Sequence, residues 1–450
     1  MYPTIRIIVG EIIIGDILNQ RREEIQMTWN SKWVPILITS IWCLSWGTDP
    51  LLGIDDHRVV LKFDKKTTIV PAGTPTRGMM SMVRHPDGTI YLNFQSAPPK
   101  LYKSSDNAET WTGAAVGLAQ PHQVVQGVGV NHKGRLFLVH QTAGDQPPNA
   151  PKKLYGQDLF VSYSDDNGQT WKTSPTDLGR IPPSIPNMQF HEDGIRTFIE
   201  QPDGTLMFTT TLVPTPDYAK QHGAYRQPYK RPNYQFAGRP GDFFSDIVLR
   251  SDDGGETWGD PTRVYPQLSP HESALAIDPN DGNHLLLMTR IQTAEKWYTE
   301  AQQKELMRET ENPRPHYKNG ALFESSDGGR TFALAKGGMT DWYGHRGTIY
   351  WSRSNVVVVT HSAGGRDSRK VARISLDGGK TWVNDTKTGS PFMNQSTKFV
   401  VDPDTSFSCP TVERSKDHFF SAIWHYVGSG GEILGVFWHL ERPYQEWAQP

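Results

Sequence analysis

The octet Ser-Asp-Asp-Asn-Gly-Gln-Thr-Trp at residues 164–171 is the stretch that decides the fold, because four close variants of it occur elsewhere in the chain. All follow the pattern Ser-x-Asp-x-Gly-x-Thr-aromatic, except that Ala108 stands where the others have Gly. The copies are SSDNAETW (104–111), SDDNGQTW (164–171), SDDGGETW (251–258), SSDGGRTF (325–332) and SLDGGKTW (375–382). A strand-bearing unit that returns every 50–87 residues is typical of the blades of a propeller.

The octet has the chemistry of a tight turn. Its Ser and Asp side chains can bond to the turn backbone, its Gly permits a positive φ, and its aromatic residue can return to the core. One such octet is a weak signal because many hairpins end in Asp-Gly, but five in order are a strong one.

These octets resemble the Asp-box, or BNR repeat, of the sialidase (neuraminidase) superfamily. The resemblance covers about residues 70–440 and implies an all-β protein, a six-bladed β-propeller with five Asp-boxes. We expect one propeller domain over residues 48–450, since a propeller grows by adding blades. Asp-boxes also occur in propellers without catalytic activity, so the repeat leaves function open.

Turns followed by apolar runs predict the second strand of each blade. The runs are TIYLNF (89–94), RLFLVH (135–140), TLMFTT (205–210), NHLLLMTR (283–290), VVVVTH (356–361) and HFFSAIWHY (418–426). There are six runs against five octets, so one blade is expected to lack an Asp-box. The stretch RVVLKF (58–63) is a candidate for the outer strand of the sixth blade, which would close the ring.

The N-terminal residues 1–47 show no propeller pattern. From Met27 the chain has a Lys-bearing start and then an apolar run near 34–46, which is short for a membrane span and suits the core of a signal peptide. We therefore expect export to a secreted or periplasmic location, with Met27 as the true start; a retained apolar helix is the alternative. Of the two cysteines, Cys43 lies in this segment and Cys409 remains, so no disulfide is expected.

Strand polarity predicts where a functional site lies. In an antiparallel blade the first strand starts and the second strand ends on the same rim, and these positions are rich in ionisable residues. First strands open with Arg77, His191, His271, Glu272, His345 and Arg346, and second strands end with His140, Arg290, His361 and His425. The loop at 213–242, which rises from this rim, has five basic and two acidic residues and four tyrosines. A basic, aromatic rim suits an acidic sugar, because Arg pairs with carboxylates and aromatic faces stack on sugar rings.

The resemblance assigns roles to some of these residues. Sialidases hold the substrate carboxylate with three arginines, and Arg77, Arg290 and Arg346 match those positions. Glu272 matches the carboxylate that raises the basicity of the nucleophile. The remaining rim histidines are candidates as well: His271 and His191 for catalysis, and His140, His345, His361 and His425 for substrate binding.

Two sialidase positions do not match. The family's general acid is an Asp after the second strand of the first blade, where this chain has NFQSAPP (93–99) without an acid. The family's nucleophile is a Tyr near the start of the last blade, where Phe407 stands. Tyr426, or alternatively Tyr343, is the candidate nucleophile in its place, and Asp145 or a His is the candidate acid.

Three functions remain open at this point. The first is a glycosidase of exo-α-sialidase type; the second is a polysaccharide lyase that uses His or Tyr and Arg on uronate-containing glycans. The third is a non-catalytic glycan-binding propeller. The net charge of −2 gives no reason to expect nucleic acid as a partner, and we expect no cofactor, no stable membrane span and no metal, since no short two-His spacing marks a metal site.

Overall fold

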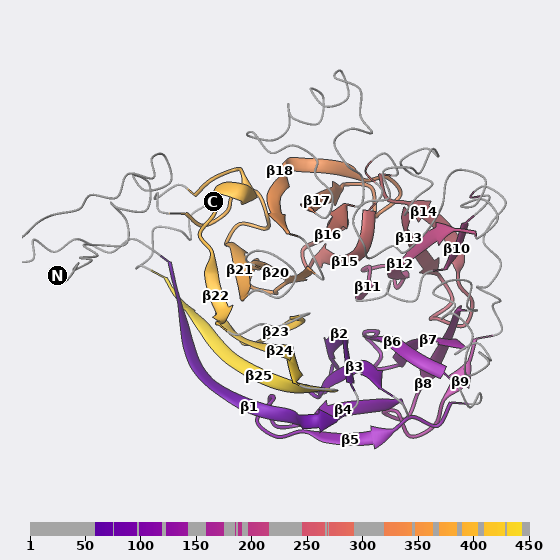
Figure 1. The fold of residues 1–450 in the computed structure, drawn as a ribbon. Helices are drawn as coiled ribbons and strands as arrows, with labels where there is room; N and C mark the ends of the chain where they lie inside the picture. The colour runs from indigo at the N-terminus through magenta and orange to yellow at the C-terminus, as the bar shows by residue number, and fades with distance from the viewer. Residues whose placement is uncertain are drawn as a thin grey trace, which may run out of the picture. The chain divides into compact units, whose positions relative to one another are not determined.

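The computed structural model describes residues 59–74, 76–96, 99–118, 123–142, 159–174, 185, 188–190, 197–215, 245–265, 268, 270–291, 319–343, 347–362, 369–384, 389–403, 409–427 and 430–442. In this described part of the chain, six antiparallel sheets follow one another around a ring (Figure 1). The predicted all-β, six-bladed propeller is therefore confirmed. Within these residues no helix is both long and apolar enough to cross a membrane. The expected export segment, 1–47, lies outside them, whereas Cys409 is free and buried.

The first three blades are built in chain order. Blade 1 is β2 (Thr76–Arg84), β3 (Ile90–Ser96), β4 (Lys100–Ser104) and β5 (Thr112–Ala115). Blade 2 is β6 (Gln123–Val130), β7 (Leu136–Thr142), β8 (Leu159–Ser164) and β9 (Lys172–Thr173). In blade 3 both β10 (Met188–Phe190) and β11 (Phe198–Glu200) pair with β12 (Leu206–Pro214), followed by β13 (Ser245–Ser251) and β14 (Gly259–Arg263).

The last three blades continue the order until the final one. Blade 4 is β15 (Pro270–Asp278), β16 (Asp281–Ile291), β17 (Asn319–Ser325) and β18 (Ala333–Tyr343). Blade 5 is β19 (Thr348–Trp351), β20 (Val357–Ser362), β21 (Lys370–Ser375) and β22 (Phe399–Asp402), with the short 3-10 helix η4 (Met393–Gln395) before β22. Blade 6 combines β23 (Thr411–Ser415), β24 (His418–Val427) and β25 (Gly430–Glu441) with β1 (Val60–Thr74) from the other end of the described chain.

The pairing of β1 with β25 closes the ring. The register runs from Val60 opposite Glu441 to Thr74 opposite Gly431. The prediction of an outer strand near 58–63 is confirmed, although the strand extends to residue 74 and residue 58 lies outside the described part. The six predicted second strands are also present, as β3, β7, β12, β16, β20 and β24.

Each Asp-box connects the third and fourth strands of its blade, and the hydrogen bonds of its Ser, Asp and Thr side chains are the same in all five copies. In the second copy, Ser164 Oγ donates to Asp166 and accepts from Gly168 N, while Asp166 accepts from the Thr170 N–H and hydroxyl. The indole of Trp171 donates to the Gly168 carbonyl. These Thr and Ser hydrogen bonds favour the ionised carboxylate and lower the pKa of Asp166 to about 2.

The hydrophobic core is divided among the six junctions between blades. One buried cluster joins blades 2 and 3 through Phe137, Phe208 and Trp258, and corresponding clusters lie at the other five junctions. Both faces of every blade are therefore covered by its neighbours, which supplies the main burial of apolar area.

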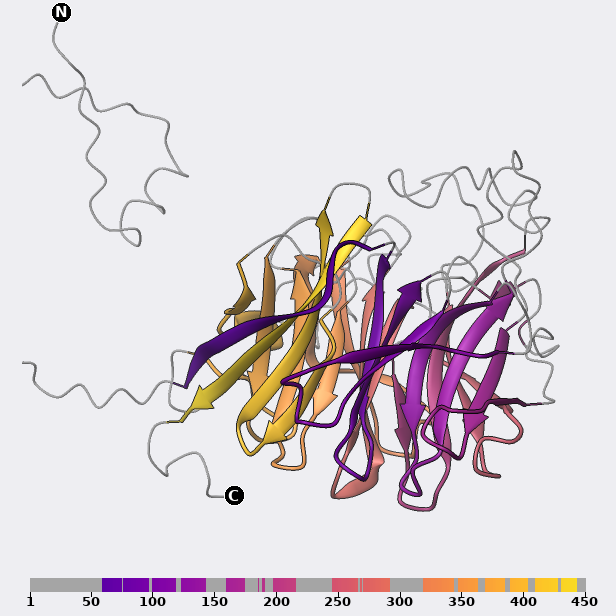
Figure 2. The ribbon, with the colours of Figure 1, turned by 90° about the horizontal axis from the view of Figure 1, so that it is seen from below.

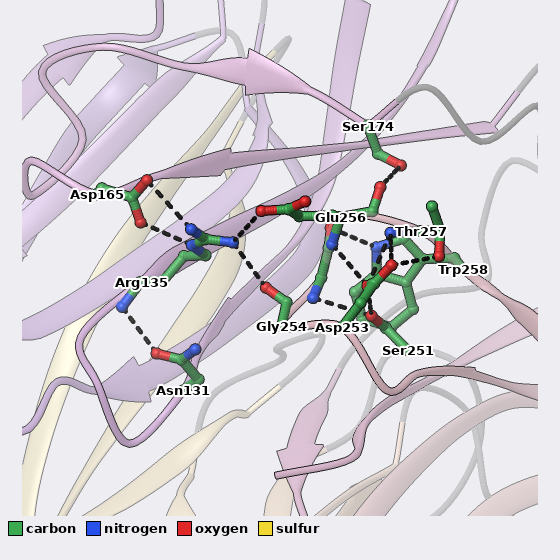
Figure 3. A network of polar contacts seen from close by, with 11 residues as sticks. Asn131, Arg135, Asp165, Ser174, Ser251, Asp253, Gly254, Glu256, Thr257 and Trp258 are labelled. Carbon is green, nitrogen blue, oxygen red and sulfur yellow. Dashed lines mark hydrogen bonds and ion pairs between the residues drawn. The ribbon is translucent and has the colours of Figure 1, made fainter.

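Polar contacts add to this packing at the Asp-box end of the ring. Arg135, on the turn between β6 and β7, pairs with Asp165 at 2.6 Å and donates to the Gly254 carbonyl of the next blade at 3.0 Å (Figure 3). Arg414 of blade 6 donates in the same way to the Asn107 carbonyl of blade 1, at 2.8 Å. Asp-boxes thus link blades as well as closing hairpins, and second strands end at the opposite rim (Figure 2).

We predict that an alanine in the third Asp-box costs more stability than one in the second. Gly168 and Gly255 have φ values of +83° and +89°, so either substitution is expected to lower the free energy of unfolding by about 1 kcal/mol through backbone strain. A Cβ on Gly168 would meet Leu101 at 3.4 Å, but on Gly255 it would lie 2.1 Å from the Phe137 ring across the junction. Gly255→Ala should therefore lose roughly 1–3 kcal/mol more in urea unfolding. Equal losses for the two variants would contradict this account.

Candidate functional site

The start of β15 is irregular at the predicted rim. His271 pairs with Arg290 and Ala274 pairs with Met288, so three steps along β15 oppose two along β16 and form a β-bulge. Within the bulge Glu272 has a φ of +64°, a left-handed conformation that a Glu rarely adopts. Such strained backbone positions gather at functional sites.

The bulge brings together the three rim residues that strand polarity predicts at this blade. Arg290 Nη2 lies 3.2 Å from Glu272 Oε1 and 2.5 Å from His271 Nδ1. All three side chains are buried, with residue exposures of 1–2%. Because the guanidinium must donate to His271 Nδ1, the ring proton of a neutral His271 is on Nε2. The site therefore holds a carboxylate and an imidazole against one arginine.

One acid at this site was missed by the sequence analysis. Asp246, at the start of β13, is fully buried and accepts hydrogen bonds from the hydroxyls of Thr211 (2.5 Å) and Thr289 (2.9 Å). Burial raises the pKa of Asp246 to about 6, helped by the negative charge of Glu272 and opposed by the hydroxyl hydrogen bonds. The signal that was available is a lone acid in SDIVLRS (245–251), next to the apolar run at 247–249 that needs a buried environment.

His140 lies near the end of the second strand of blade 2, which runs on to Thr142, and its side chain is fully buried. Its Nε2 lies 2.7 Å from Ser162 Oγ, and the ring stacks on Phe160. Its Nδ1 has no hydrogen-bond partner among the described residues. Burial lowers the pKa of His140 to about 4, so the ring is neutral near pH 7.

His361, at the end of β20, is packed into the junction of blades 4 and 5. Its ring stacks on Trp342 with centroids 3.5 Å apart, its Nδ1 lies 2.7 Å from the Ser362 carbonyl oxygen, and its Nε2 accepts from Arg373 Nε at 3.1 Å. Burial and the charge of Arg373 lower the pKa of His361. Both ring nitrogens are thus engaged within the protein.

His425 lies in an ionic cluster that ties blade 5 to blade 6. Its Nε2 is 2.5 Å from Asp402 Oδ2 and its Nδ1 is 3.3 Å from Glu432 Oε1, while Lys66 Nζ of the closing strand β1 is 2.9 Å from Asp402 Oδ1. Burial acts to lower the pKa of His425, but Asp402 and Glu432 outweigh it and raise that pKa. The buried Asp402 carboxylate is in turn kept ionised by its two cationic partners, which lower its pKa against the effect of burial.

The other predicted site residues are not tested by these contacts. Arg77 and Tyr426 lie on strands β2 and β24, but the structure describes only their backbone. His191, His345 and Arg346 lie outside the described residues altogether, as do Asp145 and Phe407. The three-arginine arrangement and the nucleophile therefore stay predictions.

No group of three His, Cys, Asp or Glu side chains that could hold a metal ion occurs in the described part of the chain. The contacts at the blade 3–4 junction offer recognition of an anion by Arg290, which is paired with Glu272. Asp246 lies close enough to Glu272 for the two negative charges to interact.

Comparisons with known proteins agree with the repeat and the fold. The BNR/Asp-box repeat model matches residues 162–173. Comparison with curated protein sequences finds no match. Among solved structures, the chain is similar to a protein of unknown function from Dyadobacter fermentans, with a TM-score of 0.57 and 16% identity over 85% of this chain and 99% of that one.

Two further structures have named activities. The Hadza microbial sialidase Hz136 has a TM-score of 0.53 and 16% identity, over 84% of this chain and 68% of that one. An α-L-arabinofuranosidase from Fusarium graminearum has a TM-score of 0.50 and 12% identity, over 84% and 97%. The resemblance to the sialidase superfamily is thus confirmed for the repeat and the propeller fold. Because proteins acting on different sugars share this fold, it does not select the substrate.

We predict that Asp402→Asn lowers the pKa of His425, because it removes the buried carboxylate that favours the imidazolium. In the unchanged protein, the stability due to the raised pKa of His425 is complete below about pH 6.5 and is lost as the pH rises through the folded-state pKa. NMR titration of the His425 ring measures the pKa directly. The Tm of the unchanged protein should fall as the pH rises through the same window.

Asp64→Asn is the matched control. It removes a partly exposed contact to His439, at 2.7 Å on the same blade, and should leave the His425 titration unchanged. The prediction is contradicted if His425 has the same pKa in the Asp402→Asn variant as in the unchanged protein.

Proposed function

We propose that this chain is a glycoside hydrolase of the sialidase type, acting on a terminal acidic sugar that it binds at the rim formed by His271, Glu272 and Arg290. The observation that carries the proposal is the state of the Arg290 side chain. Its Nη2 contacts Glu272 and His271, but its Nε is buried and has no hydrogen-bond partner among the described residues. A buried, unpaired N–H of a charged group is costly, and a sugar carboxylate is the kind of acceptor that would satisfy it.

The other roles follow the same chemistry. Glu272, 3.2 Å from Arg290, would accept the proton of the nucleophile and so raise its reactivity. Tyr426 is the candidate nucleophile, and Arg77 and Arg346 would complete the binding of the carboxylate. His271 and His191 are the candidates for moving the proton that the leaving group needs. Export to a secreted or periplasmic location is part of the same proposal.

The lyase alternative requires a basic nitrogen near the sugar. His361 does not fit this role, because both of its ring nitrogens are engaged with Ser362 and Arg373 in the blade 4–5 junction. His140 retains the role best, since its ring is neutral near pH 7 and its Nδ1 has no partner among the described residues. An assay for the unsaturated sugar that a lyase forms distinguishes this reaction from hydrolysis.

We predict that Arg290→Ala abolishes the activity. The test measures release of the fluorophore from a fluorogenic sialoside, together with the affinity for free N-acetylneuraminic acid. Arg290→Ala and Arg290→Lys should each weaken sugar binding by about 100-fold, the first by removing the charge and the second by losing the paired N–H donors. Urea unfolding of both variants establishes that they are folded.

Arg330→Ala is the control, since Arg330 is an exposed side chain of the fourth Asp-box, at the opposite end of the blades. It should bind and cleave as the unchanged protein does. Unchanged affinity in a folded Arg290→Lys variant rejects the role of Arg290. Sugar binding by the unchanged protein without cleavage of the sialoside, and without an unsaturated product from uronate polymers, favours the binding-only propeller.

A further inference from the structure

The buried Asp246 carboxylate bridges two blades through two threonines. Thr211 lies on β12 of blade 3 and donates its hydroxyl to Asp246 Oδ1 at 2.5 Å. Thr289 lies on β16 of blade 4 and donates to Asp246 Oδ2 at 2.9 Å. Each carboxylate oxygen therefore fixes one hydroxyl proton, one on each side of the junction.

A threonine hydroxyl has a single proton, so donation to Asp246 leaves its lone pairs facing other donors. The Thr211 oxygen accepts the backbone N–H of Glu272 at 3.1 Å, and the Thr289 oxygen accepts the backbone N–H of His271 at 3.1 Å. The two N–H groups are consecutive, and both belong to the bulge. One carboxylate thus orients both hydroxyls toward the backbone at the candidate site.

This backbone needs such support. Glu272 has a φ of +64°, and the bulge takes the residue out of the regular pairing of β15 with β16. A strained conformation persists only where its surroundings over-determine it. The side chain of Glu272 pairs with Arg290, with Oε1 3.2 Å from Nη2. A shift of the bulge would therefore move Glu272 relative to Arg290.

We propose that Asp246 is a positioning residue, which acts through the hydroxyls of Thr211 and Thr289 to hold Glu272 against Arg290. An ionised carboxylate accepts from both hydroxyls, whereas an amide oxygen accepts from one and an amide nitrogen from neither. Thr289 Oγ1 also lies 3.2 Å from the His271 carbonyl oxygen, but the carboxylate is the nearer and charged acceptor. The backbone role stands on these contacts alone, and its consequence for sugar binding rests on the proposed function.

The first experiment measures amide hydrogen exchange in peptides that cover residues 270–275. Asp246→Asn and Thr211→Val should increase exchange at His271–Glu272 roughly tenfold, while peptides over the Asp-boxes stay unchanged. Thr211→Ser, which keeps the hydroxyl, should retain the protection of the unchanged protein. Thr289→Val is an independent second variant, expected to affect the His271 amide. Unchanged protection in Asp246→Asn and in both valine variants overturns the inference.

The second experiment measures the affinity of the same variants for N-acetylneuraminic acid. Asp246→Asn and Thr211→Val should weaken binding about tenfold, and Thr211→Ser should rescue it. Lost protection with unchanged affinity overturns the link from Asp246 to the sugar. If the unchanged protein does not bind the sugar at all, the proposed function fails, while the exchange result still decides whether Asp246 holds the bulge.

Discussion

The pairing of β1 with β25 is the constraint on which the rest of the structure depends. It joins residues near both ends of the described chain, with Val60 opposite Glu441, and so gives blade 6 its outer strand. Every blade buries apolar side chains against both neighbours, so an open ring would leave two blade faces in water. Closure of the ring also fixes the position of each blade relative to its neighbours. Rim residues therefore meet defined partners on the adjacent blade.

Hydroxyl groups of one blade hold the backbone of the next at several junctions. Ser81 accepts from Val128 N between blades 1 and 2, and Thr348 donates to the Cys409 carbonyl between blades 5 and 6. Thr211 accepts from Glu272 N between blades 3 and 4 in the same manner. At this last junction the hydroxyl also donates to the Asp246 carboxylate. The hydroxyl contact that recurs between blades is therefore linked to a buried acid at the candidate site.

Much of the fold could be predicted because its signals are local. The Asp-box bonds span four residues, and the turn before each second strand is adjacent to it in sequence. The contact of Glu272 with Arg290 was also within reach, since strand polarity places both at one rim. The role of Asp246 was not, because its partners Thr211 and Thr289 are 35 and 43 residues away and are ordinary strand residues by type. Likewise, strand polarity placed His361 at the rim but could not show that its ring turns to Trp342 and Arg373.

Asp402 and Asp246, the aspartates that are buried among the described residues, have opposite effects on the stability of the fold. Asp402 is paired with Lys66 and His425, and these cations lower its pKa despite burial, so its charge strengthens the junction it spans. The hydrogen bonds that the described residues give the Asp246 carboxylate come from hydroxyls, and burial raises its pKa to about 6. An ionised Asp246 therefore costs stability at neutral pH instead of adding to it. A group that weakens the folded state and yet fixes the backbone of Glu272 is more readily explained by the site it supports than by the fold.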